Sequence, residues 1–215
     1  MGDNFRESLR ELNNYVLAIG RKVENGIKKS IKALEEGNIE LATEVIIEDK
    51  HIDEMELILE ERSTRLISLH QPKDKDLRMV IVISKILTDL ERIGDHAANI
   101  AEKVIDINGE ELQISIDEII DMSNLAISRF RESLDAFVNM DVKIAKKVAR
   151  EDERLDTMDE DILQKMTAYM SGEKALVKQA TALMFIGRFL ERIGDHSTNI
   201  CERVIYMASG EREIY

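Results

Sequence analysis

The chain has 215 residues, of which 44% are hydrophobic and only 4% aromatic. This hydrophobic content is enough for a packed core and argues against wholesale disorder, whereas one proline, no tryptophan and few aromatics argue against a β-sandwich. A formal net charge of -13 opposes non-specific binding to nucleic acid, which needs clustered lysine and arginine, and suits cations or a basic partner surface instead.

The first half of the chain predicts three long helices with short connections. Apolar residues recur at helical spacing over residues 5–34, and the Glu-Gly-Asn sequence at residues 36–38 is typical of a helix end. A second helix follows over residues 42–66 and ends near Gln71-Pro72, because the residue before proline disfavours helical angles. A third covers residues 77–105, and Asn108-Gly109 predicts the turn that closes this unit.

The second half repeats this plan. A helix is predicted from about Ser115 to residues 139–141, another through residues 145–169 to Ser171-Gly172, and a last one over residues 177–205 that ends near Ser209-Gly210. Short connections favour antiparallel neighbours. The sequence therefore predicts an all-α protein with two tandem up-down-up three-helix bundles, the first over residues 1–110 and the second over residues 111–215.

An internal repeat supports the two-bundle prediction. The string Leu-Glu-Arg-Ile-Gly-Asp-His occurs at residues 90–96 and again at residues 190–196. An acidic block at residues 48–55, Glu-Asp-x-x-Ile-Asp-x-Met, returns at residues 151–158 with Leu in place of Ile. Two blocks that recur in the same order indicate that one three-helix unit is present twice.

Acidic residues occupy helix positions where an apolar seam is expected. Residues four apart share one face of a helix, so the second and third helices of each unit turn pairs of carboxylates toward one region. Burial of several unpaired carboxylates is costly, and hard oxygen ligands suit Mg²⁺, Mn²⁺, Ca²⁺ or iron better than zinc. The predicted metal ligands are Asp49, Asp53, Glu91 and Asp95 in the first unit, and Asp152, Asp156, Glu191 and Asp195 in the second.

Two other arrangements could also make these acids tolerable. Arg92, Arg192 and Lys103 could neutralise them, or the acids could lie on a solvated flank. Gly94 and Gly194 lie inside helices, where glycine costs about 1 kcal/mol relative to alanine, and this favours a close backbone approach beside the acids. The sequence alone does not decide between metal binding, neutralisation by basic residues and a solvated flank.

His96 and His196 lie beside the acids but on another part of the helix surface. Each is about 100° around its helix from the preceding aspartate, so an interface or supporting role is expected rather than metal ligation. Cys201 is the only cysteine, which excludes an intrachain disulfide and favours a reducing compartment. With no membrane-spanning apolar run in the sequence, a cytoplasmic location is expected.

The duplicated string at residues 90–96 and 190–196, with Gln71-Pro72-x-x-x-Asp76-Leu77-Arg78 and the repeated acidic block, resembles the signature of the PhoU family. The resemblance implies a three-helix bundle for each repeat and metal ions, iron or zinc in some members, held by Glu/Asp-x-x-x-Asp pairs at the acidic positions above. The resemblance does not indicate whether the bound ion is Fe, Zn, Mn or Mg. The second unit departs from the pattern, since Ser171-Gly172 replaces the Gln-Pro pair.

The family resemblance also implies a function. It implies a cytoplasmic negative regulator of phosphate uptake and of phosphate-starvation signalling, and not an enzyme. The implied partners are the ATPase of the phosphate ABC transporter and the sensor histidine kinase, and a homodimer is expected.

Two alternatives come from other classes of protein. A di-iron or manganese carboxylate enzyme on a helical bundle would use Glu-x-x-His, but Glu91 and His96 are five residues apart. A purely structural helical scaffold with an acidic surface would show no stabilisation by metal ions.

Overall fold

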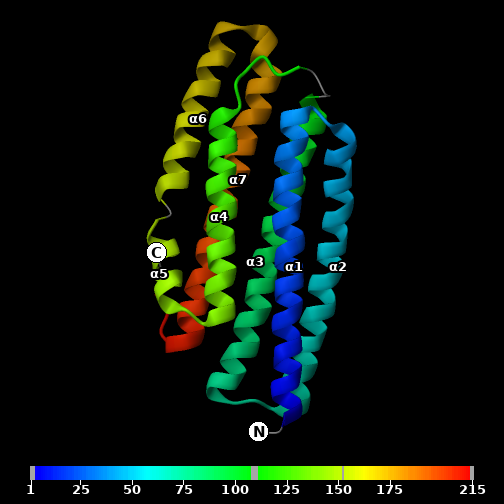
Figure 1. Cartoon of the computed structure of the whole chain (residues 1–215), viewed down its shortest axis with the longest axis vertical. Helices are drawn as coiled ribbons and strands as arrows, with labels where there is room; N and C mark the ends of the chain where they lie inside the picture. Colours follow the sequence, from blue (N-terminus) through cyan, green and yellow to red (C-terminus); the bar gives the residue numbers. More distant parts are fainter. Residues whose placement is uncertain (1–2, 108–110, 152, 214–215) are drawn as a thin grey trace.

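The computed structural model describes residues 3–107, 111–151 and 153–213, which contain helices and no β-strand. The first bundle consists of α1 (Asp3–Glu36), α2 (Ile39–His70) and α3 (Asp74–Ile107). The second consists of α4 (Asp117–Asn139), α5 (Val142–Arg150), α6 (Glu153–Gly172), the 3₁₀ turn η1 (Lys174–Leu176) and α7 (Val177–Ser209). The first bundle runs up, down and up along the long axis of the molecule, and the second runs down, up and down (Figure 1). The all-α fold with a tandem repeat is confirmed.

The turns after α1 and after α4 are built alike. Gly37 and Met140 adopt the left-handed conformation, with φ of 61° and 51°. Asn38 and Asp141 then cap the following helices, and each side chain accepts a backbone N–H from the first turn of its helix, at 2.9 Å and 2.8 Å respectively. The predicted ends at residues 36–38 and 139–141 are therefore confirmed, and they are equivalent points of the repeat.

The fifth predicted helix is interrupted. One continuous helix over residues 145–169 was expected, but α5 ends at Arg150, Glu151 lies in a turn, and α6 begins at Glu153. The first bundle has Lys50 where the second has Glu153. The acidic run at residues 151–153 of the second bundle therefore contains no basic residue. Negative charge is more favourable in the first turn of a helix than in its interior. The acidic run therefore favours the start of a new helix at this point.

The two bundles lie lengthwise against each other. α3 and α7 run antiparallel through the middle of the molecule, and α1 packs against α4 (Figure 1). Buried apolar residues from both bundles form one continuous core. Consequently the units are not separated by solvent, and the division between residues 110 and 111 stays a prediction.

A buried glutamine holds the connection between the bundles. The side-chain oxygen of Gln179, on α7, accepts the backbone N–H of Gln113 at 3.0 Å, and its amide nitrogen donates to the carbonyl of Glu111 at 3.0 Å. The segment before α4 is therefore fixed on the second bundle. The predicted turn at Asn108-Gly109 lies outside the described residues. Among the described helices, none is apolar over a long enough stretch to cross a membrane.

Candidate metal centres

The first acidic cluster joins α2 to α3. Asp49 and Asp53, one turn apart on α2, and Asp95 on α3 each place a carboxylate oxygen within 4.8 Å of the others. Gly94 makes this approach possible, since a Cβ at that position would lie 2.8 Å from Oδ1 of Asp49. The close approach predicted at Gly94 is confirmed.

The oxygens of the first cluster are poorly compensated. Among the described residues, Oδ1 of Asp49, Oδ1 of Asp53 and Oε2 of Glu91 are buried without a hydrogen-bond partner. Burial raises the pKa of Asp49 to about 7, and the neighbouring carboxylates of Asp53 and Asp95 add to this effect. An added positive charge would therefore stabilise this cluster.

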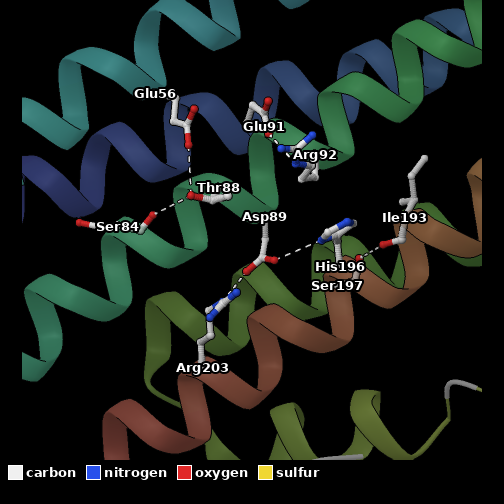
Figure 2. A network of polar contacts seen from close by, with 10 residues as sticks. All are labelled: Glu56, Ser84, Thr88, Asp89, Glu91, Arg92, Ile193, His196, Ser197 and Arg203. Atoms are coloured by element: carbon white, nitrogen blue, oxygen red, sulfur yellow. Dashed lines mark hydrogen bonds and ion pairs between the residues drawn. The ribbon is translucent and has the colours of Figure 1, made fainter.

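Glu91 lies beside the first cluster but outside its group of three. Burial, followed by the charge of Asp95, raises the pKa of Glu91. Arg92, whose side chain is 54% exposed, lies 3.3 Å from a carboxylate oxygen of Glu91 (Figure 2). It also lies 3.3 Å from a carboxylate oxygen of Asp95. Lys103 pairs with Asp106 instead. Arg92 thus provides part of the neutralisation that was the alternative to metal.

The second acidic cluster joins α6 to α7. Asp156, Glu191 and Asp195 bring their carboxylate oxygens within 4.8 Å of one another. Burial raises the pKa of Glu191 to about 7, with the charge of Asp195 as the next cause, and burial also raises the pKa of Asp195. Asp152, the remaining predicted ligand, lies outside the described residues.

The second cluster contains an arginine that the sequence analysis did not identify. Nη1 of Arg188 lies 2.8 Å from Glu191 and 3.3 Å from Asp159. The equivalent residue of the first bundle is Thr88, whose hydroxyl donates to Glu56 at 3.1 Å (Figure 2). The signal available in the sequence was an arginine two residues before the second copy of the repeated string, where the first copy has Thr88.

A buried carboxylate links the two bundles beside the second cluster. Asp89 on α3 is 3% exposed, accepts from Nδ1 of His196 at 3.1 Å, and pairs with Nε of Arg203, both on α7 (Figure 2). The sequence analysis missed Asp89, although the repeat has Phe189 at the equivalent position. The interface role expected for His196 is the one that this geometry supports.

His96 lies at the same contact between α3 and α7. Its ring stacks on Phe189 with centroids 5.8 Å apart, and its centroid is 5.7 Å from that of His196. Burial lowers the pKa of His96 to about 4, with the charges of His196 and Arg192 as further causes. His96 is therefore a neutral interface residue at physiological pH. Cys201 is buried.

The donor set of each cluster fits a hard cation. Oxygens bound to one Ca²⁺ at ~2.3–2.6 Å can be up to about 5 Å apart, so a separation of at most 4.8 Å lies within reach of one ion. The buried oxygens without hydrogen-bond partners are those that an ion would satisfy. Three carboxylates from two helices can hold such an ion and tie the helices together, while metal ligation itself stays a prediction.

The chain matches the model of a known protein family. The model of the PhoU domain matches residues 16–104 and residues 119–204. These two segments contain the described residues of both acidic clusters, one cluster in each segment.

Individual relatives match along nearly the whole chain. The Phosphate-specific transport system accessory protein PhoU homolog of Clostridium acetobutylicum is 37% identical over 209 residues, which cover 97% of this chain and 95% of that protein. The accessory protein PhoU of Escherichia coli is 32% identical over 207 residues, covering 96% and 86%.

Two solved structures have the same fold. The crystal structure of PhoU from Pseudomonas aeruginosa superposes with a TM-score of 0.92 at 33% identity and covers 96% of this chain and 100% of that one. The phosphate transport system regulatory protein PhoU from Streptococcus pneumoniae gives 0.92 at 31% identity and covers 98% and 100%.

Proposed function

Because the chain belongs to the PhoU family, we propose that it is an accessory protein that regulates a phosphate transport system. In the finer form of the proposal it acts in the cytoplasm, without catalysis, as a negative regulator of phosphate uptake and of phosphate-starvation signalling. One observation carries the proposal. Relatives named as accessory proteins of phosphate transport match over almost the full length of both chains.

The proposed partners are proteins. Contacts with the transporter ATPase and with the sensor histidine kinase would carry the regulation, and a homodimer would be the working form. A net charge of -13 supports a partner surface that is basic. Purified protein with an affinity tag, incubated with each purified partner candidate, should retain at least one of them, and retention should weaken as salt rises. If neither the ATPase nor the kinase is retained, the contact mechanism is wrong.

We further propose that the two acidic clusters bind metal ions. Asp49, Asp53 and Asp95 would hold one ion and Asp156, Glu191 and Asp195 another, with Glu91 and Asp152 as additional oxygen donors. When bound, an ion supplies the positive charge that these carboxylates lack. The support is geometric, since the ligand oxygens converge from two helices and several are buried without partners.

Genetics tests the regulatory role. Deletion of the gene should derepress phosphate-starvation genes in cells grown at high phosphate, and the wild-type copy should restore repression. A variant with Asp53→Asn and Asp156→Asn reports whether the clusters matter for repression. Unchanged expression in the deletion strain would contradict the regulatory role.

Elemental analysis tests the metal proposal. Purified wild-type protein should retain metal, and Asp53→Asn together with Asp156→Asn should remove it. Asp121→Asn, at an exposed carboxylate on α4 that belongs to neither cluster, is the matched control. Metal-free wild-type protein whose melting temperature ignores Mn²⁺, Fe²⁺, Mg²⁺ and Zn²⁺ would favour the scaffold alternative.

A further inference from the structure

The outer face of α2 carries large apolar residues that the core does not use. The side chains of Ile47, Ile58 and Leu69 are 53%, 51% and 68% exposed. α2 packs against α1 and α3, at the edge of the molecule that faces away from the second bundle (Figure 1). Its apolar core residues are a separate set, Ala42, Val45, Ile52, Leu59 and Leu66. The helix is therefore apolar on two faces, and one of them is open to solvent.

The three exposed residues lie in line along the helix. Each is 11 residues from the next, and this spacing corresponds to about three helical turns plus ~20°. The stripe from Ile47 to Leu69 is therefore nearly straight and about 33 Å long. Single exposed apolar residues are common on protein surfaces, so the alignment is informative only if the fold does not itself require it.

The second bundle shows that the fold does not require the stripe. An offset of 103 residues aligns the acidic blocks at residues 48–55 and 151–158. At this offset the equivalents of the three stripe residues are Arg150, Asp161 and Gly172, and all three are exposed. The same three-helix unit thus folds with charged residues or glycine on this face. The stripe belongs to the first bundle alone and fits a contact that only this bundle makes.

The charges on this face of α2 are arranged in two halves. Glu54 lies between Ile47 and Ile58, and Arg65 lies between Ile58 and Leu69. Both are exposed, and within the described part of the chain neither side chain forms an ion pair or a hydrogen bond. One half of the stripe is thus acidic and the other basic. Such a surface is complementary to a second copy of itself that runs in the opposite direction.

We propose that the outer face of α2 is the contact surface for a second copy of this chain. The two α2 helices pack antiparallel about a two-fold axis near residue 59. This arrangement brings Ile58 against Ile58 of the other copy and Ile47 near Leu69 of the other copy. Glu54 of each copy then lies level with Arg65 of the other. The inference rests on the homodimer proposed above and adds the surface that forms it.

A groove at the end of the stripe provides a place for an apolar side chain. It has a volume of about 320 Å³ and lies between the first turns of α1 and the last turns of α2. Its lining includes the buried residues Leu12 and Leu66 together with the exposed Leu69. In the antiparallel arrangement Ile47 of the other copy lies level with this groove, which removes more apolar surface from water than a flat helix face does. By symmetry the contact is made twice.

The proposed contact leaves the first acidic cluster free. Asp49 and Asp53 lie on the side of α2 that faces α3, about 140–180° around the helix from Ile58. Association of two copies and cation binding therefore use different faces of the same helix. Variants in the stripe should accordingly leave Mn²⁺ binding unchanged, and the two proposals are tested independently.

Sedimentation of the intact chain over a range of concentrations measures the contact. One helix from each copy makes an interface at the small end of the specific range, so we expect a dissociation constant in the micromolar range. Wild-type protein should therefore pass from monomer to dimer between about 1 and about 100 µM.

Ile58→Asp tests the centre of the stripe. The second bundle has an aspartate at the equivalent position, so the fold tolerates the change, and circular dichroism verifies this. Association should weaken by roughly a hundredfold or more, because two apolar side chains lose their burial and two carboxylates face each other. Leu163→Asp, at a 44% exposed leucine of α6, is the matched control and should associate as the wild type does.

A charge exchange tests the antiparallel direction. Glu54→Arg and Arg65→Glu should each weaken association by about threefold to tenfold, because each places like charges level with one another. The double variant restores opposite charges and should recover association close to that of the wild type. A double variant as weak as the single ones would overturn the antiparallel arrangement.

The oligomeric state separates this proposal from the one on which it rests. A wild-type dimer whose association is unmoved by Ile58→Asp would overturn the α2 surface and leave the homodimer in place. Wild-type protein that remains a monomer up to about 100 µM would overturn both the homodimer and its surface. Retention of the transporter ATPase or of the kinase tests the regulatory role apart from either result.

Discussion

Single residues control how close α3 comes to the carboxylate of Asp49. Gly94→Ala would place a Cβ 2.8 Å from Oδ1 of Asp49 and 3.3 Å from Ile52. Alanine gains about 1 kcal/mol of helix propensity, and a displaced carboxylate costs a similar amount, so the free energy of unfolding should change by less than about 1 kcal/mol. Metal binding at the first cluster should nevertheless weaken, because Asp49 must move. Chemical denaturation and Mn²⁺ titration measure the two effects separately.

Gly26→Ala is the matched control for Gly94→Ala. Its Cβ meets only Ala97, at 3.7 Å, and does not touch the carboxylate. The same gain in helix propensity should therefore stabilise the protein by about 0.5–1 kcal/mol and leave Mn²⁺ affinity unchanged. If both alanine variants bind Mn²⁺ as the wild type does, the position of Asp49 is not set by Gly94.

The raised pKa values of Asp49 and Glu191, each about 7, predict how stability depends on pH. In the unfolded chain these carboxyl groups titrate near ~4, so between about pH 4 and about pH 7 the folded state binds more protons. Their contribution to the free energy of unfolding therefore falls as pH rises through this window. Since Asp49 is partly solvated and Arg188 pairs with the buried Glu191, the effect should be about 1 kcal/mol, or roughly 2–4 °C in melting temperature.

Melting of metal-free protein across this pH window, compared with Asp49→Asn, isolates the carboxylate. The variant has no proton to lose, so the decline in melting temperature from about pH 5 to about pH 8 should be smaller than in the wild type. Added Mn²⁺ should raise the melting temperature more at the higher pH, because protons no longer compete for the oxygens. An Asp49→Asn variant with the full wild-type slope would show that another group is responsible.

The eight predicted ligands came from helical spacing, and six of them lie in the two groups of converging oxygens. Spacing sufficed for these because residues four apart on a helix share a face. It could not place Glu91 at the edge of its cluster, since that depends on side-chain direction at the helix contact. Nor could it find Arg188 or Asp89, because their roles depend on neighbours from other helices.

Among the elements, α5 depends most on its cap. This nine-residue helix begins after Asp141, whose Oδ1 accepts the backbone N–H groups of Lys143 at 2.8 Å and Ile144 at 3.1 Å. Isolated helices of this length are marginal in water. Asp141→Ala should therefore cost about 1 kcal/mol in the free energy of unfolding and speed hydrogen exchange within α5. Asp141→Asn retains an accepting oxygen and should recover most of the loss, while equal losses in both variants would contradict a capping role.

The interruption between α5 and α6 shows the limit of periodicity at the element scale. Ala145 and Leu155 keep a helical spacing across the break, and both are buried, so the apolar pattern alone reads as one helix. The signal was instead the change from Lys50 to Glu153. Turn residues were more informative about where helices end. Gly37 tolerates the left-handed conformation at the end of α1, and Pro72 disfavours helical angles in the residue before it, at the end of α2.

For the whole molecule, the contact between α3 and α7 is the feature that unites the bundles. Its apolar residues belong to the continuous core, while its polar centre is formed by Asp89, His196 and Arg203. The repeat is broken here, because Phe189 at the position equivalent to Asp89 stacks on His96. One side of the contact is thus ionic and the other aromatic. We therefore expect this difference to fix the register of the two bundles.

Asp89→Ala should therefore be strongly destabilising. Removal of the carboxylate leaves Arg203 and His196 facing an interface without their acceptor, and removal of one partner of a buried pair commonly costs ~3–5 kcal/mol. Because Arg203 and His196 remain about one quarter exposed, at 27% and 23%, water offsets part of this cost, and we expect roughly 2–4 kcal/mol in the free energy of unfolding by chemical denaturation.

A double-mutant cycle separates the ion pair from the packing at this interface. Arg203→Met retains most of the side-chain volume, so in its presence Asp89→Ala should cost less than in the wild type, by about 1 kcal/mol or more of coupling. Asp89→Asn keeps an acceptor without the charge and should fall between wild type and Asp89→Ala. Additive losses would mean that Asp89 acts through packing alone. The ionic centre would then not hold α3 and α7 in register, and the continuous apolar core would account for the union of the two bundles.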